Sequence, residues 1–165
     1  MLVMLPSTID GLDGRLIGAM AAAPRAGMLE LARRLQVARG TVQARLDKLL
    51  QRGVITGFGP EIDLRALGYE VQAFTTLEIA QGRLRDVVAH LRDIPEVLET
   101  HAITGAGDLH CRVAARTNAH LQDVVNRILE VQGITRASTV IALSEQIPYR
   151  ILPLVEAAAA YAGAP

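Results

Sequence analysis

Three side chains with metal-binding chemistry lie within an eleven-residue stretch, His101, His110 and Cys111. Imidazole and thiolate are ligands for zinc and copper, and neighbouring strands would bring them within reach of one another. The spacing, however, contains neither a Cys-x-x-Cys pair nor a His-x-x-x-His pair. We therefore expect partly buried strand histidines and no metal site.

Catalytic motifs are missing from the sequence as well. It has no Walker loop, nucleophile elbow or Rossmann glycine pattern, and Asp108 has no acid or base partner nearby in the chain. We predict that the protein is not an enzyme and needs no cofactor.

One predicted helix, after residue 38, carries small and donor side chains in a pattern that suits DNA. Val42, Leu46 and Leu49 form its buried stripe, so small and polar residues face outward. Such a face can approach a major groove closely. We expect Arg45 and Lys48 to contact phosphate, and Thr41 and Gln43 to contact base edges. The full set of candidate DNA-binding residues is Arg25, Arg39, Gly40, Thr41, Gln43, Ala44, Arg45 and Lys48.

The charge distribution favours DNA binding over an ordinary all-α core, which is the alternative for an amphipathic helix pair. Residues 1–60 hold eight Lys and Arg against four acids, while the whole chain is neutral. The basic excess is modest, so useful affinity would need two or more copies acting together.

The elements that position this helix form a three-helix head. Apolar residues recur at helical spacing from Leu12 to Met20 and from Met28 to Leu35, and only residues 36–38 separate the second helix from the third. So short a connection predicts a helix-turn-helix. Gly53 is expected to end the third helix.

Beyond residue 68 the hydrophobic pattern changes to strand, helix, strand, strand, helix, strand. The predicted fold is α+β, with a winged-type helix-turn-helix followed by a βαββαβ domain of ferredoxin-like type. We place the DNA-binding domain at 1–60, a linker at 61–68, the βαββαβ domain at 69–146, and a C-terminal helix or arm at 147–165.

The βαββαβ domain is expected to associate with further copies of itself. Helices should cover one sheet face, and we expect Leu77, Val113 and Ile141 on the other face, where they are too apolar for water. We therefore predict a dimer formed sheet against sheet or edge to edge.

Composition bounds the remaining possibilities. Half of the 165 residues are apolar and no long uncharged apolar run occurs, which indicates a globular protein without a membrane span. The first ten residues lack the features of a signal peptide, so a cytoplasmic location is expected. Cys111 is the only cysteine, which excludes an internal disulfide.

The head, linker and βαββαβ order resembles the Lrp/AsnC family of feast/famine transcriptional regulators. The resemblance rests most on the V-x-x-R-L-x-x-L run from Val42 to Leu49 and on the G-x-x-D loop from Gly105 to Asp108. It implies a RAM-type C-terminal domain, a dimer that builds to tetramers or octamers, binding to double-stranded DNA, and an amino acid effector between C-terminal domains.

The resemblance also implies an effector site. In the family the G-x-x-D loop receives the amino acid, and the last strand contributes threonines. Here the expected effector-binding residues are Thr104, Gly105, Ala106, Gly107, Asp108 and Thr139. Alanine replaces the family's first threonine at position 137 and its serine at position 38. An ordinary hairpin turn is the alternative interpretation of the loop.

Two other functions stay open at this point. Sirohaem decarboxylases resemble the same architecture and use histidines, which His101 and His110 would provide. A DNA-architectural protein that ignores small molecules is the second. An absorbance scan with a tetrapyrrole and a thermal-shift screen with amino acids would separate the three.

Overall fold

The structure, a computed structural model, describes residues 9–162 and divides into two compact units. The described residues up to Gly59 join those from Ile147 onward in a helical unit, and Pro60–Gln146 form a sheet unit. The expectation of no signal peptide rests on the first ten residues, of which residues 1–8 lie outside the described range. Within that range no helix is both long and apolar enough to cross a membrane.

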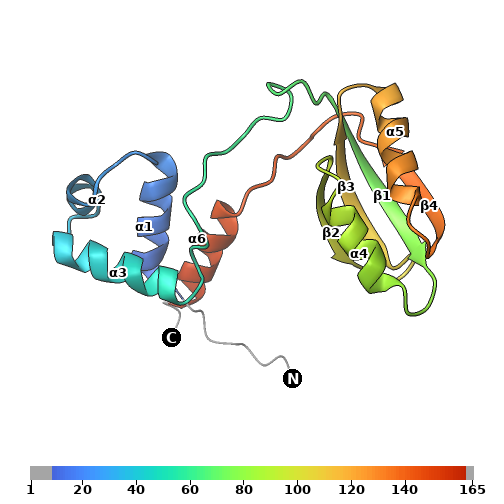
Figure 1. Cartoon of the computed structure of the whole chain (residues 1–165). Coiled ribbons are helices and arrows are strands. Elements are labelled where there is room, and N and C mark those ends of the chain that lie inside the picture. Colours follow the sequence, from blue (N-terminus) through green and yellow to red (C-terminus); the bar gives the residue numbers. More distant parts are fainter. Residues whose placement is uncertain (1–8, 163–165) are drawn as a thin grey trace. The chain divides into compact units, whose positions relative to one another are not determined.

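The helical unit contains α1 (Gly11–Ala22), α2 (Met28–Leu35), α3 (Arg39–Gln51) and α6 (Leu152–Tyr161) (Figure 1). The predicted helix-turn-helix is confirmed, since three residues separate α2 from α3 and the first of them, Gln36, has a left-handed φ of 56°. Leu16, Leu31 and Leu49 are almost fully buried and hold the helices together. The predicted wing is not a strand here, because the strands of residues 9–162 all lie between Val71 and Ile141.

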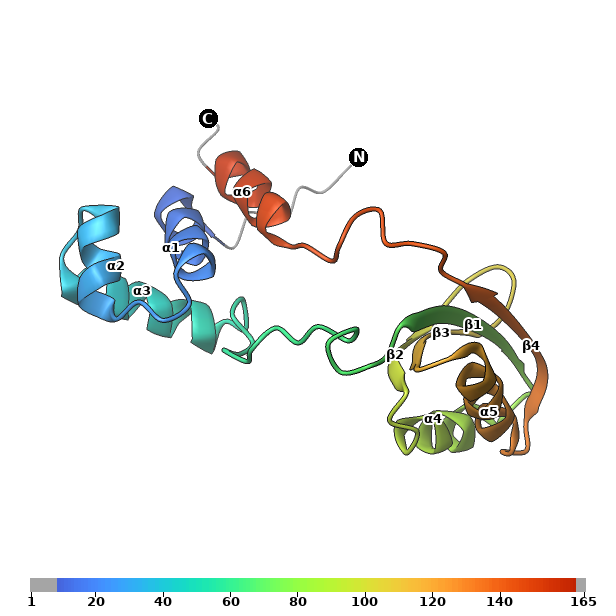
Figure 2. The same ribbon diagram turned by 90° about the horizontal axis from the view of Figure 1, so that it is seen from above.

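The C-terminal helix α6 packs against α1 (Figures 1 and 2). Ala159 is buried in the same core as the first three helices, with Val155 and Ala158 beside it. The fit is close at Gly14, where an added Cβ would lie 2.7 Å from Cβ of Ala159. The sequence predicted a C-terminal helix or arm without giving its position, and the structure shows α6 as a fourth helix of the helical unit.

We expect Gly14→Ala and Gly18→Ala to have opposite effects on stability. A methyl group at Gly14 must push α6 away and should cost about 1 kcal/mol, because tight packing resists added volume. No atom lies within 4 Å of an added Cβ at Gly18, so there the better helix propensity of Ala should stabilise by up to about 1 kcal/mol. Urea unfolding of both variants measures the difference. Equal effects would show that α6 does not press on α1 in solution.

The sheet unit has the predicted βαββαβ order: β1 (Val71–Ile79), α4 (Leu84–Arg92), β2 (Val97–Ala102), β3 (Leu109–Ala115), α5 (Asn118–Leu129) and β4 (Ile134–Ile141). The strands are antiparallel in the order β2-β3-β1-β4. Both helices cover one face of this sheet (Figure 2). The α+β, ferredoxin-like fold class is confirmed.

The two faces of the sheet differ in character. Leu77 and Val113 are fully buried in the core beneath the helices. Ile141 is 47% exposed, but it pairs with the core residue Ala73 and so lies on the same side of the sheet. Their assignment to the uncovered face was therefore wrong: alternation along a strand directs its most apolar residues toward the helices. The uncovered face carries mainly polar side chains, among them Gln72, Thr76, His110 and Arg112, together with Phe74.

Candidate functional site

The exposed face of α3 presents most of the predicted DNA-binding residues. Val42, Leu46 and Leu49 are buried, which turns the small and polar residues between them toward solvent. Gln43 donates a hydrogen bond to Asp47 one turn later, at 2.9 Å. Arg25 is exposed in the turn between α1 and α2. The exposed residues of α3 from the predicted set are Arg39, Gly40, Thr41, Gln43, Ala44 and Lys48.

Arg45 has another role within the helical unit. Its guanidinium forms ion pairs with Asp10, and with Asp13 at 3.0 Å. The hydrogen bond from Arg45 is the main reason that the pKa of Asp10 lies below its ordinary value, and the same contact raises the pKa of Arg45. The guanidinium is thus held inside the helical unit, and Lys48 is the better candidate for phosphate contact.

The two aspartates also cap α1. Asp10 accepts hydrogen bonds from the amides of Leu12 and Asp13, and Asp13 accepts one from the amide of Asp10. This capping box fixes the start of α1, and Arg45 ties it to α3. The acids three residues apart predicted a helix N-terminus, whereas their partner 35 residues away carried no local signal.

The predicted effector loop, residues 104–108, is anchored to β1 through Asp108. The amide of Asp108 donates to the carbonyl of Leu77 at 2.8 Å, and its carboxylate Oδ2 accepts from the amide of Ile79 at 2.6 Å. Gly107 has a φ of 112°, and a Cβ there would lie 2.5 Å from Cγ2 of Thr76. Glycine is therefore required for the close approach of the loop to β1.

The other predicted effector residues lie around this anchor. Thr104, Gly105 and Ala106 are exposed at the tip of the loop. Thr139 shares a hydrogen bond of 3.0 Å with Thr75, two residues along β1 from Leu77. The structure thus brings the loop and Thr139 to adjoining stretches of β1, while Oδ1 of the exposed Asp108 side chain remains open to a ligand.

The histidines and the cysteine do not converge on a metal. Cys111 lies in the core, where burial raises the pKa of its thiol, and His110 faces the opposite side of the sheet. His110 stacks on Phe74 at 5.6 Å and shares a hydrogen bond with Thr76. Within residues 9–162 no group of three or more His, Cys, Asp or Glu side chains could hold a metal ion.

Comparisons with known proteins match both units. Residues 9–50 match the AsnC-type helix-turn-helix domain, and residues 72–152 match the Lrp/AsnC ligand binding domain. The regulatory protein AsnC of Escherichia coli (strain K12) is 31% identical over 147 residues, which cover 88% of this chain and 97% of AsnC. An HTH-type transcriptional regulator of Mycobacterium tuberculosis is 30% identical over 143 residues, covering 84% and 95% of the two chains.

Solved structures agree with these relatives. The structure of E. coli AsnC aligns with a TM-score of 0.82 at 30% identity, covering 88% of this chain and 99% of that one. A transcriptional regulator from Neisseria meningitidis in complex with L-Met aligns with a TM-score of 0.78, covering 85% and 93%, and at 22% identity it shows the fold alone. The relatives are regulators, which confirms the prediction that the chain is not an enzyme. The chain belongs to the Lrp/AsnC family of helix-turn-helix transcriptional regulators and carries that family's ligand binding domain.

Proposed function

We propose that this regulator binds double-stranded DNA through the exposed face of α3, works as a homo-oligomer, and responds to an amino acid bound at the loop of residues 104–108. The observation that carries the DNA-binding part is the exposure of Arg39, Thr41, Gln43 and Lys48 over the buried stripe of α3. Arg39 is the first residue of α3, so the start of the helix presents donors, as groove recognition requires.

The effector part is supported by the chemistry of the loop. An α-amino acid needs an acceptor for its ammonium group and donors for its carboxylate. Asp108 is exposed, and its carboxylate would accept from the ammonium group. Gly105 and Ala106 are exposed as well, and their backbone amides would donate to the carboxylate of the ligand. The structure of the Neisseria regulator, which shares the fold, is a complex with L-Met. We propose that this chain also binds an α-amino acid.

Self-association is supported by apolar residues at the edges of the sheet. Leu98 of β2 is 41% exposed and Val140 of β4 is 59% exposed, and both strands are edge strands. A second copy would bury them, and a dimer that assembles further to a tetramer or octamer would present several helical units to one DNA molecule. Such a regulator acts on the chromosome, which in the bacteria and archaea of its relatives lies in the cytoplasm.

The DNA-binding part is tested by Lys48→Ala. We expect the Kd for a duplex of mixed sequence to rise about fivefold at low salt, and the salt slope to fall by about one, because one phosphate contact is lost. Arg85→Ala, which removes an exposed cation from α4, is the matched control and should leave both quantities unchanged. Identical affinities for the Lys48 variant and the wild type would exclude this face of α3 as the interface.

The effector part is tested by screening the twenty amino acids by thermal shift, with the size of the assembly measured for each hit. Asp108→Asn should abolish the shift that the effector causes, since the amide cannot pair with an ammonium group. A shift that survives in this variant would place the ligand elsewhere.

A further inference from the structure

An apolar side of the helix α6 is left uncovered by the other described residues. Glu156 is the only charged residue of this helix, while Leu154 and Tyr161 are each 69% exposed. A helix that is apolar on nearly every side is normally buried on nearly every side. The match to the ligand binding domain ends at residue 152, where α6 begins, and the helix-turn-helix match ends at residue 50. The two family domains therefore do not account for this helix.

A groove runs between α6 and α1 within the helical unit. It has a volume of about 330 Å³, and its lining consists of glycine and alanine apart from Arg15 of α1 and Glu156 of α6. The axes of two helices can approach closely where the side chains between them are small. We call this groove, together with Leu154 and Tyr161 of α6, the α1–α6 face.

The two charged residues make the α1–α6 face complementary to itself. Arg15 and Glu156 are both exposed, and neither forms an ion pair with another residue in the range 9–162. In a two-fold pair, contacts between two copies are reciprocal. A two-fold axis along the groove therefore sets Arg15 of each copy opposite Glu156 of the other. This charge pattern favours a second copy of the same chain as the occupant of the groove.

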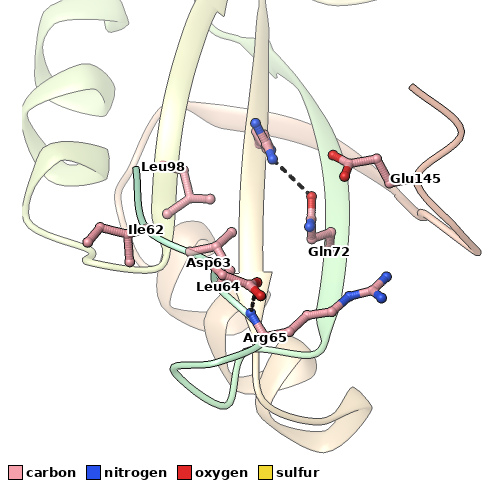
Figure 3. Close-up of a pocket in the computed structure, with 8 residues that line it drawn as sticks. Ile62, Asp63, Leu64, Arg65, Gln72, Leu98 and Glu145 are labelled. Carbon is pink, nitrogen blue, oxygen red and sulfur yellow. Dashed lines mark hydrogen bonds between the residues drawn. The ribbon is translucent and has the colours of Figure 1, made fainter. Parts of the chain in front are cut away.

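Self-association of the sheet unit would bring a second helical unit near the first. Figure 3 shows Leu98 and Gln72 on the uncovered face of the sheet, which a second copy covers in the predicted sheet-to-sheet dimer. The connection before α6, residues 142–151, spans at most about 35 Å. Helical units held by such connections meet at an effective concentration on the order of millimolar, so a small surface is enough to join them.

We propose that the α1–α6 face is an interface between the helical units of two copies, with α6 of each copy lying on α1 of the other. The interface rests on the proposed homo-oligomer and adds to it a contact that joins the two helical units directly. Such a contact fixes the distance between the two copies of α3, and with it the spacing of the DNA half-sites that one dimer can bind. The regulator then selects its sites by half-site separation as well as by base sequence.

Cross-linking through a single introduced cysteine tests this contact in the full-length protein. Cys111 is fully buried, so a short bismaleimide reacts with the introduced, exposed cysteine. Ala160→Cys, in the groove, should join two copies at least about fivefold faster than Arg33→Cys, because the second groove is held close by. Arg33 is an exposed residue of α2 outside the groove and provides the matched control.

Charge reversal tests whether a second copy occupies the groove. In the Ala160→Cys background, Arg15→Glu and Glu156→Arg should each slow cross-linking about fivefold, because like charges then face one another across the interface. Co-expression of the two variants under different tags should restore the rate in the mixed dimer, where each acid again meets a base. Mixing cannot restore an ion pair within one copy, since both charges of each variant copy have the same sign.

Sedimentation velocity separates failure of this interface from failure of the proposed function. A wild type that sediments as a monomer would reject the homo-oligomer and the interface together. An oligomer in which Ala160→Cys cross-links no faster than Arg33→Cys would reject the α1–α6 interface alone. The same conclusion would follow if the mixed charge variants cross-linked as slowly as each variant by itself.

Discussion

Replacing Gly107 by alanine should destabilise the sheet unit by about 3 kcal/mol, since a left-handed backbone and a steric clash act together at this position. The added Cβ would lie 2.5 Å from Thr76 and 3.2 Å from the carbonyl oxygen of Leu77. Those atoms belong to β1, one of the two central strands, so the loop must shift away from β1 and weaken the hydrogen bonds between Asp108 and that strand. Urea unfolding measures the loss, and the amino acid thermal shift should disappear with it.

Gly105 provides the matched control for this prediction. Its φ of 103° is also in the left-handed region, but nothing lies within 4 Å of an added Cβ. Gly105→Ala should therefore cost only the backbone strain, about 1 kcal/mol. If the two variants were equally stable, the close contact between the loop and β1 would contribute nothing to the stability of the sheet unit.

Arg45→Ala should destabilise the helical unit by about 2 kcal/mol, because it leaves the buried carboxylate of Asp13 without its cation. The side chain of Asp13 is 4% exposed and that of Arg45 is 29% exposed, so water replaces only part of the lost contact. Asp10→Asn is the control: it retains a capping side chain at a half-exposed position and should cost less than 1 kcal/mol, roughly the value of a surface ion pair.

The effect of Arg45→Ala should depend on pH in a defined direction. Because the folded state lowers the pKa of Asp10, the ion pair stabilises the unit above the pKa of an unfolded aspartate, roughly 3.9. Stability is lost as the pH falls through the lower, folded pKa. The gap between wild type and variant should therefore narrow on acidification below about pH 4. A gap that widens there would contradict the ion pair as its cause.

The secondary structure and order of the domains could be predicted because they depend on local patterns. Residues 36–38 leave room only for a turn between two helices. The change of hydrophobic pattern beyond residue 68 indicates the strands and helices that the structure shows there. The cap of α5 shows the limit of such patterns. Thr117 and Asn118 are both of types that cap helices, and it is Thr117 that accepts the hydrogen bond from the amide of His120. Local propensity indicates where a helix begins to within a residue or two, but backbone geometry decides which of two adjacent residues caps it.

Contacts between distant residues were not predictable from the sequence. Arg45 and Lys48 both looked like phosphate-binding cations, and only the fold shows that Asp10 and Asp13 hold the first of them. The pairing of charges across a fold depends on tertiary geometry, which periodicity does not encode.

The return of the chain to the helical unit at α6 has a mechanical consequence. A domain joined to the rest of a protein by one flexible linker can rotate about that linker without limit. Here the chain passes from the helical unit to the sheet unit after α3 and returns before α6, so two connections join the units. Each full rotation of the DNA-reading helices relative to the sheet would wind these two connections around each other. The polypeptide thus has a built-in torsional limit, set by the lengths of the two connections, residues 52–70 and 142–151.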